Sequence, residues 1–85
     1  MPPFELLALL RARPFRPFRI VMTEGQGYLV RHPENVIVTP ASAHVGYPDE
    51  KEPAMSLRVD IISLAQVRAL ELIEQPAQKP GDGQG

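Results

Sequence analysis

Apolar and polar side chains follow two different periods along this chain, and the change of period separates one helix from a series of strands. Near the N-terminus, Phe4, Leu7 and Leu10 recur at intervals of three, with further leucines beside them. This spacing is typical of the apolar stripe of an amphipathic helix, here over residues 3–13. Pro14 disfavours helical geometry at the residue before it, so we expect the helix to end there.

From residue 18 onward the period is two, which is typical of β-strands. The predicted strands are 18–23, 28–31, 36–39, 43–47, 56–64 and 67–73, the last being either a strand or a short helix. Gly25 and Gly27 favour a tight hairpin between the first two strands, because glycine adopts positive φ at little cost. Gly46 indicates a bulge or a close approach of the backbone within the fourth strand.

A helix followed by five or six short strands, joined by few residues, must curl if its strand edges are to be protected. We therefore expect an α+β fold that is mainly β. The N-terminal helix is expected to cover an open end or face of a strongly bent antiparallel meander, of the SH3-like or Sm-like small-barrel type.

The length of 85 residues predicts one domain, 1–75, followed by a disordered tail, 76–85, whose sequence PAQKPGDGQG has no large apolar side chain. A domain of about 75 residues buries only about 60–65% of its unfolded surface, so its stability is marginal. The chain has no cysteine, which excludes disulfides and thiolate-bound zinc as additional support. Self-association is the remaining way to bury more surface.

The net charge of −1 hides an uneven distribution. Residues 1–32 carry five arginines against two glutamates, whereas residues 33–85 carry eight acidic side chains against four basic ones. This balance excludes a strongly basic nucleic-acid binder and leaves room for one basic patch. No apolar run reaches the length of about 20 residues that a membrane helix needs. We expect a cytoplasmic protein without a membrane partner.

The stretch RARPFRPFRI, residues 11–20, has three interpretations. Pro14 and Pro17 can form the joint between helix and first strand, with Phe15 and Phe18 buried beside it. PFRP also matches the P-x-x-P pattern of SH3-domain ligands. Finally, the arginines can form a patch that binds phosphate or a partner, with aromatic rings between them as in single-stranded nucleic-acid binders. The candidate residues of this patch are Arg11, Arg13, Arg16 and Arg19.

The order of a leucine-rich helix, RPFRPFRI, TEGQGYLVRHPENVIV and DIISLAQVRALEL resembles a group of short uncharacterised bacterial proteins. In that group a Pro-Phe-x-Pro-Phe segment precedes a first hairpin, and a V-x-His-Pro step follows it. The similarity covers about Phe4 to Ile73, and Glu24-Gly25 stands where the group usually has Asp-Gly. The resemblance implies a complete small domain and no particular substrate.

The side chains that could carry chemistry are too scattered to predict a catalytic or metal site. His32 and His44, with Glu34 and Asp49, do not have the spacing of a zinc site. Ser42 lies two residues before His44, without an oxyanion-hole glycine pattern or an ordered third partner. We therefore expect a protein that is not an enzyme and that has no cofactor or metal.

Two hypotheses of function follow from the sequence. The first is a small non-catalytic binding or assembly domain that acts through protein–protein contacts, with itself as a homo-oligomer or with another protein. The alternative is binding of RNA or single-stranded DNA by an Sm-like barrel through the N-terminal arginine patch.

Overall fold

The computed structural model describes residues 1–73 and is mainly β, with a single N-terminal helix in that range. The elements in chain order are α1 (Pro3–Arg11), β1 (Phe18–Met22), β2 (Gly27–Val30), η1 (Pro33–Asn35), β3 (Val36–Val38), β4 (Ser42–Pro48), β5 (Ser56–Ser63), η2 (Leu64–Gln66) and β6 (Val67–Leu72), where η1 and η2 are 3₁₀ turns. The predicted tail, 76–85, lies outside the described residues. The last predicted segment is a strand and not a helix.

Helix α1 is shorter than the sequence predicts. Its chain becomes extended at Ala12 (φ −60°, ψ 141°), one residue before the position that Pro14 restricts. The helix buries Leu6 and Leu10, which lie four residues apart on one face. Phe4, by contrast, is 75% exposed, so the predicted apolar stripe is wrong at this residue and correct at Leu10.

The segment between α1 and β1 forms the predicted joint. The Arg13–Pro14 peptide bond is cis, and the chain then enters β1 at Phe18, which is fully buried. Phe15 is half-buried and meets Phe18 edge to face, with ring centroids 6.1 Å apart and planes at 61°. Both rings pack with the core, so the two phenylalanines serve folding, as the joint interpretation predicted.

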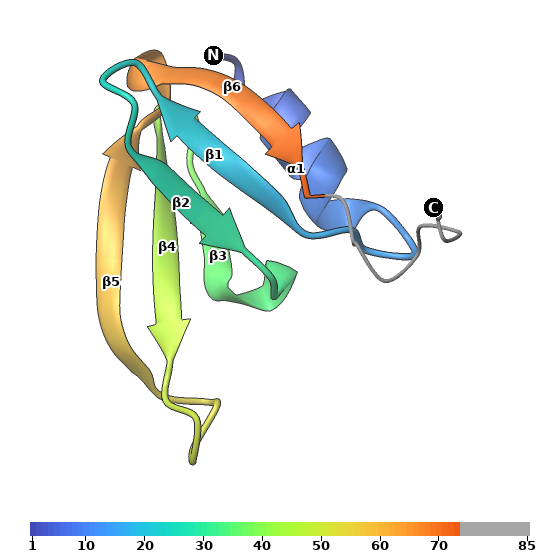
Figure 1. Cartoon of the computed structure of the whole chain (residues 1–85), viewed down its shortest axis with the longest axis vertical. Helices are drawn as coiled ribbons and strands as arrows, with labels where there is room; N and C mark the ends of the chain where they lie inside the picture. Colours follow the sequence, from blue (N-terminus) through green and yellow to red (C-terminus); the bar gives the residue numbers. More distant parts are fainter. Residues whose placement is uncertain (74–85) are drawn as a thin grey trace, which may run out of the picture.

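The strands form two three-stranded antiparallel sheets, in the orders β2-β1-β6 and β3-β4-β5 (Figure 1). β1 and β2 are joined by a tight turn in which Gly25 has φ 98° and donates its N–H to the carbonyl of Met22 at 2.8 Å. The other edge of β1 pairs with β6, from Phe18 opposite Leu72 to Met22 opposite Val67. The first and last strands are therefore neighbours, and the strands that were predicted as one strongly bent meander are divided between two antiparallel sheets.

The two 3₁₀ turns direct the chain between the sheets. η1 links β2 to β3, and η2 returns the chain from β5 to β6. The strands within residues 1–73 do not form a closed barrel: the sheets meet near η2, and the hairpin of β4 and β5 extends beyond the first sheet (Figure 1). The core lies between the sheets and under α1. Its buried side chains are Leu6, Leu10, Phe18, Ile20, Met22, Val30, Ala43, Val45, Ile62, Leu64 and Val67.

Gly46 has the close backbone approach that the sequence indicated. A Cβ at this position would lie 2.9 Å from Ser56 Oγ and 3.3 Å from the carbonyl oxygen of Asn35. The strand register also shifts immediately afterwards, between Tyr47 and Pro48. The glycine therefore allows η1 and β5 to approach β4 from both sides.

Candidate interaction surface

Strand β5 directs its row of apolar side chains away from the core. Leu57, Val59 and Ile61 are 71%, 53% and 68% exposed, respectively. Successive side chains of a strand point to opposite faces, so Arg58 and Asp60 lie on the side that faces the first sheet. The strand was predicted correctly, but its most hydrophobic face is on the outside of the molecule.

The same apolar character continues across the sheet. The register places Ile37 and Ile61 on either side of His44, and Val59 lies opposite Gly46, which has no side chain to cover it. Ile37 is 66% exposed. We call this surface of Ile37, Leu57, Val59 and Ile61 the outer face. Apolar side chains clustered in this way are typical of a surface that contacts another molecule.

The free edge of β5 borders the outer face. β5 is the last strand of its sheet and pairs with β4; among residues 1–73, no strand pairs with its other edge. The N–H of Leu64 donates to the carbonyl of Ala41 on the β4 side, at 2.9 Å. Because backbone groups alternate in direction along an antiparallel strand, those of Val59 and Ile61 point away from β4. These backbone groups are placed to pair with a further strand.

On the side of the sheet opposite the outer face, Arg58 and Asp60 of β5 and Tyr47 of β4 form a polar group. The guanidinium of Arg58 lies over the ring of Tyr47, 4.5 Å from the centroid, and 3.2 Å from Asp60 Oδ2. Burial raises the pKa of the Tyr47 phenol, the charge of Asp60 acts in the same direction, and Arg58 opposes them. Arg58 and Asp60 thus form an ion pair along one strand.

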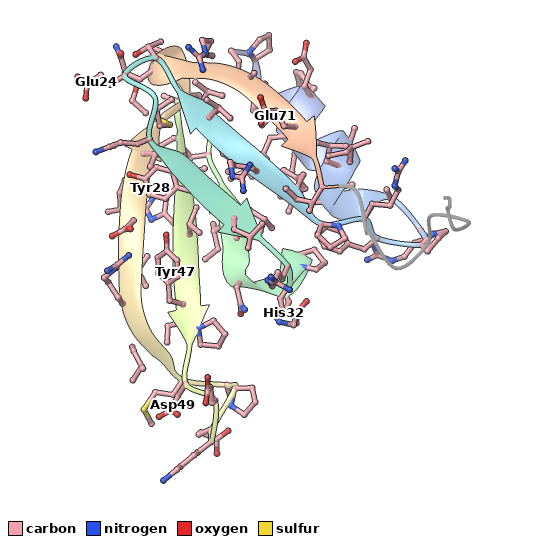
Figure 2. The ribbon with its side chains drawn as sticks, viewed as in Figure 1. Glu24, Tyr28, His32, Tyr47, Asp49 and Glu71 are labelled. Carbon is pink, nitrogen blue, oxygen red and sulfur yellow. The ribbon has the colours of Figure 1, made fainter. Side chains whose placement is uncertain are left out.

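Two adjoining grooves lie between the end of β2 and the β4–β5 hairpin, where Figure 2 labels His32, Tyr47 and Asp49. The first, of about 310 Å³, has apolar walls that include Val30, Val36 and Val45. The second, of about 400 Å³, is lined by polar and proline residues: His32, Glu34, Asn35, Pro48, Asp49, Glu50 and Pro53. The acidic groups here are partly engaged within the chain, since Asp49 Oδ1 accepts the N–H of Lys51 at 2.8 Å.

The four arginines of the predicted patch are all exposed, and their surroundings differ. Arg11 ends α1, and Arg16 lies in the linker to β1. Arg13 turns back and donates to two backbone carbonyls at the end of α1, at 2.7 and 3.3 Å. Arg19 lies on β1 directly opposite Glu71, with Nη1 3.8 Å from Oε1. Two of the four thus have partners within the chain.

The two histidines have different neighbours: His44 contacts Ser42, and His32 lies near Glu34. His32 Nδ1 lies 3.9 Å from Glu34 Oε2, whereas His44 lies on the outer side of β4, with Nε2 3.4 Å from Ser42 Oγ. The Ser42 hydroxyl also contacts Thr39 Oγ1 at 2.6 Å, in the turn from β3 to β4. Within residues 1–73, no three His, Cys, Asp or Glu side chains are grouped so that they could hold a metal ion.

The outer face was not recognised in the sequence, although one signal was present. Ile61 and Ile62 are adjacent, so the strand has an apolar side chain on each face whichever way it is oriented. In the part of the chain that the structure describes, no helix has the length and apolar character to cross a membrane. Comparisons with protein families, curated proteins and solved structures find no match for this chain.

Proposed function

We propose that this protein is a small non-catalytic binding or assembly domain, which acts through protein–protein contacts and associates with itself. The observation that carries this proposal is the exposed row of Leu57, Val59 and Ile61 beside a strand edge that no other described strand pairs with. An open edge and an exposed apolar row together form a template for pairing with another chain. Natural proteins usually protect such edges, and a partner is one way to do so.

The small size of the core supports the same proposal. The buried side chains come from a domain of few residues, so the area removed from water within one chain is limited. At roughly 25 cal/mol per Å², covering the outer face would add stability that the isolated chain lacks. Association therefore has a physical advantage for this fold, independent of the identity of the partner.

The arginine patch gives weaker support to the alternative, nucleic-acid binding. Arg13 and Arg19 already have hydrogen-bond or ion-pair partners, and a phosphate would have to compete with these. Nucleic-acid binding through single strands also uses aromatic rings on which bases stack. Phe18 is buried and Phe15 packs against it, so neither ring is presented between the arginines. We therefore prefer the protein–protein proposal.

The finer assignment of the fold, to an SH3-like or Sm-like small barrel, is also a proposal. Its support is the sheet order, in which a central first strand pairs with the second and the last strands, and the 3₁₀ turn before the last strand. An experimental structure at atomic resolution would test it by showing whether the two sheets pack as the two halves of one partly open barrel or as separate sheets.

Light scattering coupled to size-exclusion chromatography tests self-association. The monomer mass is 9.4 kDa, and we expect the wild-type protein to show a larger mass that increases with concentration. Ile61→Lys introduces a charge into the outer face and is expected to lower the mass to that of the monomer. Phe4→Lys is the matched control, because Phe4 is similarly exposed but lies on α1. A wild-type protein that is monomeric at every concentration would contradict the proposal.

A further inference from the structure

Two side chains of opposite charge flank Val59 on β5. Arg58 precedes Val59 and Asp60 follows it, and both charged side chains lie on the same face of the strand. When such a segment pairs with an antiparallel copy of itself, so that Val59 meets Val59, each arginine comes to lie opposite an aspartate. The apolar neighbours have the same property, since Leu57 then meets Ile61. This edge is complementary to itself.

We propose that two copies of this chain pair through their β5 edges, antiparallel, with a two-fold axis at Val59. The inference rests on the proposed self-association and specifies its geometry. The two β3-β4-β5 sheets then become one continuous six-stranded sheet. Because the contact is isologous, it closes on itself and gives a dimer and not a filament.

The direction of the backbone groups agrees with this register. The hydrogen bond from Leu64 to Ala41 fixes which residues of β5 bond to β4, and by alternation Val59 presents its N–H and C=O to the free edge. Two Val59 residues facing each other therefore exchange both hydrogen bonds. The flanking positions, 58 and 60, become non-hydrogen-bonded pairs, in which the side chains lie closest.

The side chains favour the register with the axis at Val59 over the registers shifted by one or two residues. With the axis at Val59, Arg58 pairs with Asp60 of the partner subunit on one face, twice by symmetry. With the axis at Asp60, two aspartates would stand directly opposite each other, and like charges in that position are destabilising. With the axis at Ile61, Asp60 would stand opposite an isoleucine and its charge would have no partner across the interface. Only the first register matches charge and apolar pairs together.

A cysteine on the axis tests the geometry directly. The chain has no native cysteine, so each variant carries a single thiol. In Val59→Cys the two Cα atoms are expected about 5.5 Å apart, within the range of a disulfide. In the matched control Ile61→Cys, which is at least as exposed as Val59, the two positions are offset by four residues, about 13 Å. Under mild oxidation, Val59→Cys should form most of its protein as a covalent dimer, and Ile61→Cys only a small fraction.

Charge-reversal variants, measured separately and then mixed, distinguish an ion pair between two chains from an ion pair within one chain. Arg58→Asp and Asp60→Arg each place like charges opposite one another in a homodimer, so each should raise Kd about tenfold or more. Mixed in equal amounts, the two variants restore opposite charges across the interface, and a heterodimer should recover the wild-type affinity. Both positions are on the surface of an edge strand, and circular dichroism checks that each variant is folded.

The outcomes separate this inference from the proposed function. A monomeric wild type rejects both. A wild type that self-associates, but in which Ile61→Cys crosslinks as fast as Val59→Cys, rejects the two-fold axis at Val59 and leaves self-association standing. A measured mass above that of a dimer also rejects this interface. So does a mixture of Arg58→Asp and Asp60→Arg whose Kd of association is no lower than that of either variant alone. Selective crosslinking together with recovery in the mixture supports it.

Discussion

Two phenylalanines of this chain have opposite surroundings, and the difference decides what each contributes. Phe18 is fully buried at the start of β1, in contact with Phe15 and at the meeting point of helix and sheet. Phe4 lies on the outer side of α1, exposed to solvent. The sequence pattern placed both rings inside, because Phe4 has the same regular spacing from Leu7 as Leu10, which is in fact buried.

Phe18→Ala is expected to destabilise the fold by about 3–5 kcal/mol, since it removes a ring from a packed site. Urea unfolding followed by circular dichroism measures the change in the free energy of unfolding. Because a domain of this size is only marginally stable, we expect the Phe18→Ala variant to be largely unfolded already without urea. Phe4→Ala serves as the control and is expected to shift the unfolding free energy by less than about 0.5 kcal/mol. Equal effects of the two substitutions would contradict the packing described here.

Gly25 carries a backbone requirement of its own. Its φ of 98° is a conformation that side chains with a Cβ rarely adopt, and it permits the hydrogen bond to Met22 that closes the turn. Gly25→Ala is expected to cost about 1–2 kcal/mol. The thermal midpoint measures this loss, with the exposed neighbour Gln26→Ala as control. A midpoint for Gly25→Ala as high as that of the control would show that the turn tolerates a side chain.

At the scale of the elements, the positions of the helix and strands were predicted better than the pairing of the strands into sheets. Local period and turn residues correctly placed the helix and every strand that the structure describes, usually to within two residues. The pairing of β1 with β6 could not be predicted in this way, because the two strands are far apart in sequence and no local pattern records their contact. The orientation of β5 was also open, since Ile61 and Ile62 give each face an apolar residue.

The β4–β5 pair offers a test of close packing. Gly46→Ala places a methyl group 2.9 Å from Ser56 Oγ, and we expect a cost of about 1–3 kcal/mol from overpacking. Ser56→Ala removes that oxygen while leaving an ordinary contact with the Cβ at 3.7 Å. The double variant should therefore lose less stability than the sum of the two single variants. Additive effects in urea unfolding would show that the hydroxyl is not the obstacle.

At the scale of the whole molecule, folding and association are expected to be coupled. If the dimer is formed only by folded chains, increasing the protein concentration stabilises the folded state by mass action. A concentration a hundredfold above Kd corresponds to about 2.7 kcal/mol, which raises the thermal midpoint of a domain of this size by about 10–20 °C. Scanning fluorimetry over that range measures the shift. Ile61→Lys should melt at a temperature that does not depend on concentration; a concentration-independent wild type would contradict the coupling.

The pairing of the first strand with the last delays the completion of the first sheet during synthesis of the chain. Met22 and Val67 face each other across 45 positions of chain, so β1 acquires its second neighbour only when nearly all of the described sequence has been synthesised. Closing so long a loop lowers the conformational entropy of the chain before the contacts between β1 and β6 stabilise it. This order of events slows folding. Until then the nascent chain has an incomplete sheet at β1 as well as the open edge at β5. During synthesis, the protein therefore passes through a period in which mispairing with neighbouring chains competes with its own completion.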